Sequence, residues 1–196
     1  MFSSQKTIVS IDLKGIIASG GRAPLNIDNL NTLFGKLRKM KFDALSIVVN
    51  SPGGSPVQSS LIAQKIREIC SKKKIKCYCF VEDVAASGGY WLACSADEIY
   101  ADINSIVGSI GVISGGFGFT ELIKKIGVER RIFTAGDNKS FLDPFEKINK
   151  KDEIKLKNLQ KQIHQNFIDW VLTRRKRKIK ENDNKTVFSG SFWLSS

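Results

Sequence analysis

With 196 residues, the chain is long enough for one domain of ordinary size, or for a domain with a helical appendage. Its hydrophobic content of 42% excludes a chain that is mostly disordered. A formal net charge of +12 would suit nucleic acid, an anionic membrane surface or acidic substrates. Much of the excess lies in the runs Lys72–Lys74 and Arg174–Lys180, which we interpret as solvated charge.

Strand and helix patterns alternate along the chain with short connections, which predicts an α/β fold with a mainly parallel sheet. The helix that starts near Asn26 can take Asn26 or Asp28 as its cap. In chain order, the predicted elements are strand Lys6–Ile17, helix Asn26–Met40, strand Ala44–Asn50, helix Val57–Lys74, strand Lys76–Glu82, helix Ser87–Ala96, strand Glu98–Ala101, a strand-like segment Val107–Ile113, helix Glu121–Ile126 and strand Glu129–Thr134.

A long amphipathic helix is predicted over Asp152–Lys180, because apolar residues recur there at steps of three and four. This apolar face would pack either on the domain or on another subunit. We therefore divide the chain into a core at residues 1–150 and a C-terminal helical assembly region at residues 151–196. The face consists of Ile154, Leu159, Ile163, Phe167, Trp170 and Val171.

The cysteines are predicted to be buried and reduced. Cys77 and Cys79 are neighbours on one face of a predicted strand, which makes them poor disulfide partners, and no zinc-ligand spacing occurs. We expect neither a metal nor a cofactor. The sequence also lacks an apolar segment long enough for a signal peptide or a membrane span. As given, we expect a cytoplasmic chain; alternatively it is the catalytic portion of a membrane-anchored protein.

Glycine-bearing turns follow three of the predicted strands, where open α/β sheets place their ligand sites. In the stretch AASGGYW, Ser87 opens a helix, and the N–H group of Gly88 could receive an oxyanion if Ser87 attacked a carbonyl. Gly54 could supply a second N–H group. The alternative is that Ser87 only caps the helix and the glycines only allow close packing.

A serine nucleophile needs a base, and the single histidine, His164, lies deep in the long C-terminal helix. A Ser-His-Asp triad is therefore not expected. Lysine can serve when burial removes its charge. Lys139 follows a predicted strand and precedes apolar residues in TAGDNKSFLDPF, although it could also be a loop lysine that points into water.

Four motifs resemble the signal peptide peptidase A family of serine-lysine peptidases, which are relatives of Clp protease and of the crotonase fold. They are NSPGGS at 50–55, AASGGYWLACSADEIYA at 85–101, GSIGV at 108–112 and GDNKSFLDPF at 136–145. The resemblance runs from about residue 8 to residue 188. It implies a Clp protease/crotonase-like spiral of repeated ββα units.

The same resemblance implies the roles of the site residues. Ser87 would be the nucleophile and Lys139 the general base, with Ser109 orienting the lysine. The N–H groups of Gly54 and Gly88 would form the oxyanion hole. Relatives form rings or domes of several subunits and commonly carry a membrane anchor, and they continue past the segment that VFSG at 187–190 matches, so the C-terminus looks short.

The sequence therefore predicts a serine endopeptidase with a Ser-Lys dyad, acting as a homo-oligomer on hydrophobic peptides such as remnant signal peptides. One alternative is a crotonase-type acyl-CoA hydratase or isomerase, for which Glu82 and Asp83 lie close to the predicted site but no CoA-binding pattern is evident. A catalytically inactive scaffold is another. Specific nucleic-acid binding is not expected, because the basic run lacks interleaved aromatic residues.

Overall fold

A computed structural model describes residues 5–20, 25–136, 138–175, 178–179 and 184–195. These residues belong to two compact units, and each is described by itself below. The first unit combines Met1–Gly111 with Asn166–Ser196, and the second unit is Val112–Gln165.

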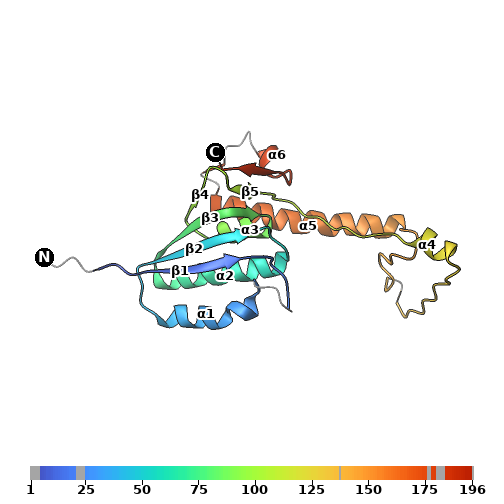
Figure 1. Ribbon diagram of the computed structural model, residues 1–196, viewed down its shortest axis with the longest axis horizontal. Helices are drawn as coiled ribbons and strands as arrows, with labels where there is room; N and C mark the ends of the chain where they lie inside the picture. The colour runs from blue at the N-terminus through green and yellow to red at the C-terminus, as the bar shows by residue number, and fades with distance from the viewer. Residues whose placement is uncertain (1–4, 21–24, 137, 176–177, 180–183, 196) are drawn as a thin grey trace. The chain divides into compact units, whose positions relative to one another are not determined.

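The first unit is built on one mainly parallel sheet, whose strands run in the order β1-β2-β3-β5-β6, with β4 paired to β3 (Figure 1). The first half of β3 pairs with β4 and its second half with β5, both in parallel, whereas β6 is antiparallel to β5. The strands are β1 (Ile8–Lys14), β2 (Ala44–Ser51), β3 (Lys76–Ala86), β4 (Glu98–Ala101), β5 (Ile106–Gly108) and β6 (Phe192–Leu194).

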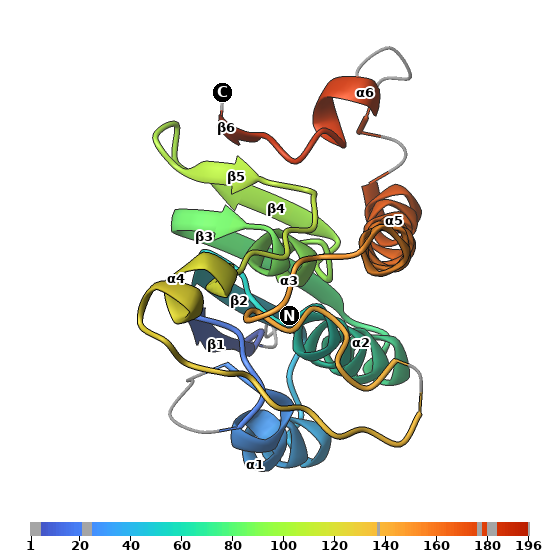
Figure 2. The ribbon, with the colours of Figure 1, turned by 90° about the vertical axis from the view of Figure 1, so that its right-hand side faces the viewer.

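The helices of the first unit bury one face of this sheet. Leu45, Ile47 and Val49 alternate along β2 and are fully buried, as expected for the inward positions of a strand. In β1 the alternate side chains, those of Ser10, Asp12 and Lys14, are exposed on the other face of the sheet. Figure 2 shows α2 and α3 together on the covered side. The helices are α1 (Ile27–Lys39), α2 (Pro56–Lys73), α3 (Gly88–Ala93), α5 (Lys150–Arg175) from residue 166 on, and α6 (Asn184–Val187).

Local signals explain where α1 and α2 begin. The Asn26 side chain accepts a hydrogen bond from the Asn29 N–H group, so Asn26 rather than Asp28 is the cap of α1. Ser55 caps α2 in the same way, with Pro56 in the first turn.

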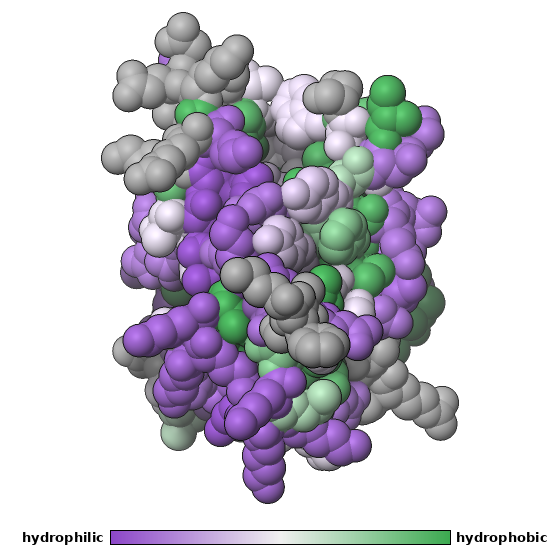
Figure 3. Space-filling model, turned by 90° about the vertical axis from the view of Figure 1, so that its left-hand side faces the viewer, coloured by the Kyte–Doolittle hydropathy of each residue, from purple (hydrophilic) through white to green (hydrophobic). Residues whose placement is uncertain are grey.

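The strands β1, β2 and β3 begin on the side seen in Figure 3, where hydrophilic side chains predominate.

The second unit contains α4 (Thr120–Lys125) and the part of α5 up to Gln165. Among its described residues, no hydrophobic side chain is fully buried. Several are almost fully exposed, with relative exposures of 92% for Ile113 and 94% for Phe133. The described part of this unit therefore lacks a hydrophobic core of its own.

The α/β fold, the mainly parallel sheet and the long helix near the C-terminus are confirmed. The cysteines Cys70, Cys77, Cys79 and Cys94 are free and buried, as predicted. The helix that was predicted to reach Lys180 ends earlier, at Arg175. Lys178 and Ile179 are not helical. Lys176, Arg177 and Lys180 of the basic run lie outside the described residues.

The strand predicted at Glu129–Thr134 is wrong. These residues are irregular, and no strand of the described chain runs beside them to accept or donate ladder hydrogen bonds. The arginines instead form short-range ion pairs, Arg131 with Glu129 at 2.6 Å and Arg130 with Asp143 at 2.9 Å.

Candidate active site

Ser87 lies at the junction of β3 and α3 in an uncommon backbone conformation, with φ 50° and ψ −121°. Positive φ is costly for a residue with a Cβ, so the surrounding contacts must hold it. Its N–H group donates to the Gly108 carbonyl oxygen at 2.8 Å, and its carbonyl oxygen accepts from the Trp91 N–H group at 3.0 Å. The half-buried side chain makes no capping hydrogen bond, which leaves the hydroxyl group available.

The turn after β2 packs directly on the turn that carries Ser87. A Cβ built on Gly53 would lie 2.8 Å from the Ser87 Cβ and 2.7 Å from the Gly88 nitrogen. A Cβ on Gly54, whose φ is +144°, would overlap the Ile17 carbonyl oxygen. Glycine is therefore required at Gly53 for the close approach of the two turns, and at Gly54 for the close approach to Ile17.

Two backbone N–H groups beside Ser87 have no hydrogen-bond acceptor in the described part of the chain, those of Gly54 and Gly88. They lie near each other, because a Cβ on Gly88 would be 3.2 Å from the Gly54 nitrogen. The first residues of a helix leave such donors free in any case. Two free donors beside an uncapped hydroxyl can bind an oxyanion that forms when this hydroxyl attacks a carbonyl.

Ser51 fixes the shape of the Gly53–Gly54 turn, a role that the sequence analysis missed. Its buried hydroxyl group donates to the Gly15 carbonyl oxygen at 2.7 Å and accepts from the Gly53 N–H group at 3.2 Å. The only signal was its place in the motif NSPGGS, which does not distinguish a turn-forming serine from a reactive one.

Ser109 lies beside Ser87 because of the strand register. Ala86 of β3 pairs with Gly108 of β5, so each serine directly follows one member of a paired couple. Ser109 also has positive φ, 51°, and its N–H group donates to the Ser191 carbonyl oxygen at 2.7 Å. The first unit thus brings together Ser87, Ser109, Gly54 and Gly88.

Lys139 belongs to the second unit, whereas Ser87 belongs to the first. It lies in a turn, where its N–H group donates to the Gly136 carbonyl oxygen at 3.4 Å, and it is exposed. Asp137, its neighbour in the GDNK motif, lies outside the described residues. His164, the single histidine, also belongs to the second unit.

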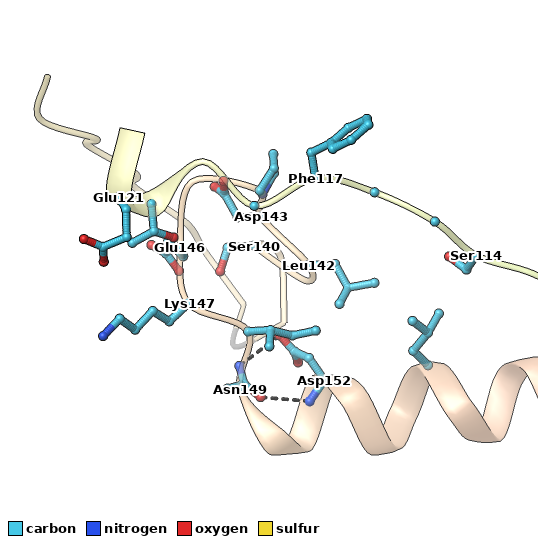
Figure 4. Close-up of a pocket in the computed structure, with 17 residues that line it drawn as sticks. Ser114, Phe117, Glu121, Ser140, Leu142, Asp143, Glu146, Lys147, Asn149 and Asp152 are labelled. Carbon is cyan, nitrogen blue, oxygen red and sulfur yellow. Dashed lines mark hydrogen bonds between the residues drawn. The ribbon is translucent and has the colours of Figure 1, made fainter. Parts of the chain in front are cut away.

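A cavity of about 660 Å³ lies within the second unit, between the loop before α4, the turn after Lys139 and the start of α5 (Figure 4). Phe117 and Leu142 contribute apolar surface, and Asp143 and Glu146 contribute carboxylates. The Asn149 side chain accepts from the Asp152 N–H group at 2.8 Å and so caps α5 at one side of the cavity. Ser87 is not among the lining residues.

Burial controls the ionisation of the groups around α3. It raises the pKa of the Cys94 thiol to about 12, and it also raises the pKa of the Tyr90 hydroxyl and the Cys79 thiol. These groups stay protonated at neutral pH. The cysteines near α3 therefore offer no thiolate that would compete with the Ser87 hydroxyl as a nucleophile.

The chain belongs to a family of peptidases. The family model described as Peptidase family S49 matches residues 70–195, a range that includes Ser87, Ser109 and Lys139, whereas Gly54 precedes it. In the part of the chain that the structure describes, no helix has the length and apolarity needed to cross a membrane.

Two named relatives match almost the whole of this chain. The chain is 51% identical over 190 residues to a protein of Brucella melitensis named Na(+)/H(+) antiporter NhaA, over 95% of this chain and 26% of that protein. It is 29% identical to the putative signal peptide peptidase SppA of Enterococcus faecium, over 96% of this chain and 58% of the relative. The chain thus spans about a quarter of the Brucella relative and less than two thirds of the Enterococcus one.

The structure comparison also found a match to a mutant form of the 1510-N membrane-bound stomatin-specific protease in complex with a substrate peptide. The sequence identity is 22% and the TM-score 0.46, over 58% of this chain and 49% of that chain.

Proposed function

We propose that the chain is the peptidase part of a serine peptidase, in which Ser87 is the nucleophile and Lys139 the general base. The observation that carries this proposal is the uncapped hydroxyl of Ser87, held at positive φ beside the free N–H groups of Gly54 and Gly88. Membership in a peptidase family supports the same assignment.

The reaction follows from these groups. The neutral Lys139 amine accepts the proton of the Ser87 hydroxyl, and the oxygen attacks the carbonyl carbon of the scissile peptide bond. The N–H groups of Gly54 and Gly88 donate to the oxyanion of the tetrahedral intermediate. Lys139 then gives its proton to the leaving amine, and water, deprotonated by the same lysine, hydrolyses the acyl-enzyme. Ser109 orients the Lys139 amine.

The proposed substrates are extended, hydrophobic peptides such as remnant signal peptides. The name of the Enterococcus faecium relative, putative signal peptide peptidase SppA, supports this choice.

We propose further that the active form is a homo-oligomer, with residues 151–196 as an assembly region. Lys139 is exposed in the single chain, whereas a general base needs an environment dry enough to lose its charge at neutral pH. The described residues of the second unit include no buried apolar side chain, and Ile154 and Leu159 of α5 are 60% and 43% exposed. A second copy of this chain that covers the second unit would bury these groups and desolvate the lysine.

The dyad is tested by the turnover of a fluorogenic apolar peptide. Ser87→Ala and Lys139→Ala should each lower kcat by about 10³-fold or more, since neither the nucleophile nor its base can be replaced by the groups that remain. Lys125→Ala, which removes another lysine of the second unit, is the control and should keep the wild-type rate. Wild-type turnover by Lys139→Ala would exclude the lysine as base.

The assembly is tested by analytical ultracentrifugation of Phe133→Asp, which places a charge on an almost fully exposed ring. The wild-type chain should sediment as an oligomer, and the variant should dissociate and lose activity in parallel. Monomeric wild-type protein with full activity would contradict the proposal.

A further inference from the structure

Helix α3 carries Ser87 at its N-terminal end, and a chain of hydrogen bonds connects this residue to α5. The Ser87 carbonyl oxygen accepts from the Trp91 N–H group at 3.0 Å. The Trp91 carbonyl oxygen in turn accepts from the Trp170 Nε1 group at 3.0 Å. One residue of α3 therefore links the peptide of Ser87 to a side chain of α5, within the first unit.

Aromatic contacts hold the same residue. The ring of Trp91 stacks on Phe167 with centroids 4.7 Å apart, and on Trp170 with centroids 6.4 Å apart. Trp91 is 7% exposed and Phe167 is 3% exposed. Trp91 is thus fixed through its backbone and through its ring.

The C-terminal end of α3 is held by Arg174. Its Nε donates to the Cys94 carbonyl oxygen at 3.1 Å, and its Nη2 donates to the Ala96 carbonyl oxygen at 3.2 Å and to an Asp97 carboxylate oxygen at 2.9 Å. The last carbonyl groups of a helix have no partner inside it. A guanidinium supplies several donors in a fixed plane, and here it occupies the turn that ends α3.

Asp97 completes this arrangement. The carboxylate oxygen that receives Arg174 also receives Arg67 of α2 at 2.9 Å, and the other oxygen accepts from the Cys77 N–H group of β3 at 2.9 Å. Helices α2, α3 and α5 are thereby joined to the sheet at one point. The side chain of Arg174 is only 19% exposed, so solvent screens this ion pair less than a surface pair.

We propose that Trp170 and Arg174 are positioning residues of the active site, which hold α3 so that the Ser87 hydroxyl and the Gly88 N–H group keep the geometry of attack. This inference rests on the proposed function. Because α3 has only six residues, a shift of its C-terminal end moves its first residue as well. A displacement of about 1 Å at a reacting group can lower a rate about 100-fold.

The test uses the full chain and four variants, of which Arg174→Ala serves only for a rescue by added guanidinium ion. Arg174→Gln removes the guanidinium, Trp170→Phe removes the N–H donor and keeps a smaller aromatic ring, and Arg175→Gln is the matched control. Among the described residues, the Arg175 guanidinium has no hydrogen-bond or ion-pair partner and acts on Tyr90 and Cys94 only through its charge. This control therefore removes the same charge one position further on without removing a donor to the end of α3. The active enzyme in each preparation is first titrated with a fluorophosphonate, and kcat per titrated site is then measured.

We expect kcat per titrated site to fall about 10- to 100-fold in Arg174→Gln and about 3- to 10-fold in Trp170→Phe, with KM changed less than about twofold. Arg175→Gln should stay within about twofold of the wild type. Guanidinium ion added to Arg174→Ala should restore part of the rate. A purely structural role would lower the fraction of titratable sites and leave kcat per site unchanged, and this result would overturn the inference.

A second measurement does not depend on activity. Amide hydrogen exchange in α3 should accelerate at least about tenfold in Arg174→Gln and Trp170→Phe, while the amides of β2 keep their protection. Unchanged exchange in α3 would overturn the inference even if the enzyme is a serine peptidase. Failure of the fluorophosphonate to label the wild-type protein would instead overturn the proposed function, and the exchange rates would still decide whether α5 holds α3.

Discussion

Replacing Gly88 by alanine separates the two properties that the glycine provides, close packing and a free oxyanion donor. The new Cβ would overlap the Oγ atom of Ser59, which is fully buried, and would lie 3.2 Å from the Gly54 nitrogen. The overlap with Ser59 involves a side-chain atom, so replacing Ser59 can relieve it. The contact with the Gly54 nitrogen involves the backbone and remains after that replacement.

The magnitudes follow from these contacts. Overpacking of a buried site costs about 1–3 kcal/mol, while alanine in a helix gains up to about 1 kcal/mol over glycine. By the same principles, Gly88→Ala alone should destabilise the fold by about 1–2 kcal/mol. Ser59→Ala removes the clashing oxygen and one hydrogen bond, from Ser59 Oγ to the Ser55 carbonyl oxygen at 2.8 Å, at a cost of about 1 kcal/mol. In the double variant Gly88→Ala/Ser59→Ala this overlap is absent. The double variant should therefore be about 1–2 kcal/mol more stable than the sum of the two single effects predicts.

The assay is urea unfolding of the wild type, both single variants and the double variant, together with peptide turnover. Turnover should fall about 100- to 1,000-fold in Gly88→Ala and stay low in the double variant, because the methyl group still stands between the two donors. Additive effects on the free energy of unfolding would refute the packing argument. Recovery of turnover with stability would refute the oxyanion argument.

Three further predictions concern the rest of the first unit. Burial works to raise the pKa of the Asp97 carboxyl, but the Cys77 N–H group and the arginines Arg174 and Arg67 outweigh it, so this pKa lies below its usual value. The ionised Asp97 carboxylate then stabilises the fold above the unfolded-state pKa of about 3.9, and this stabilisation is lost as the pH falls through the folded-state pKa. The difference in unfolding free energy between the wild type and Asp97→Asn should therefore shrink below about pH 4. Asn26→Ala removes the cap of α1 and should cost about 1 kcal/mol in thermal unfolding, whereas Asn31→Ala on the exposed side of the same helix should cost less than about 0.5 kcal/mol. The four buried cysteines are Cys70, Cys77, Cys79 and Cys94. A thiol reagent at about pH 8 should modify them only after denaturation, and fast labelling of the native chain would contradict their burial.

The sequence predicted the elements whose pattern depends on their own residues. Strands β1 to β4 and helices α1 to α3 occur where the apolar spacing places them, to within a few residues. The carboxyl ends of parallel strands meet at one edge, which is why the turns at Gly54, Ser87 and Ser109 could be predicted to lie together.

Features that depend on partners far along the chain could not be predicted. The segment Glu129–Thr134 has strand-forming residues, but a strand also needs a neighbour, and spacing does not supply one. The apolar pattern of α5 does not reveal that Phe167 and Val171 are buried while Ile154 is exposed. The contact of Arg174 with α3 joins residues 80 positions apart, and a basic run in a sequence resembles solvated charge.

The positive φ of Ser87 was also beyond prediction, because it results from hydrogen bonds to Gly108 and Trp91 and not from the residue type.

Mass spectrometry of the protein after fluorophosphonate treatment tests whether a neutral Lys139 activates Ser87. We expect a single adduct on Ser87, formed faster as the pH rises into the alkaline range and at least about 100-fold more slowly in Lys139→Ala than in Lys125→Ala. An adduct on another residue, or equal labelling rates in the two lysine variants at every pH, would contradict it.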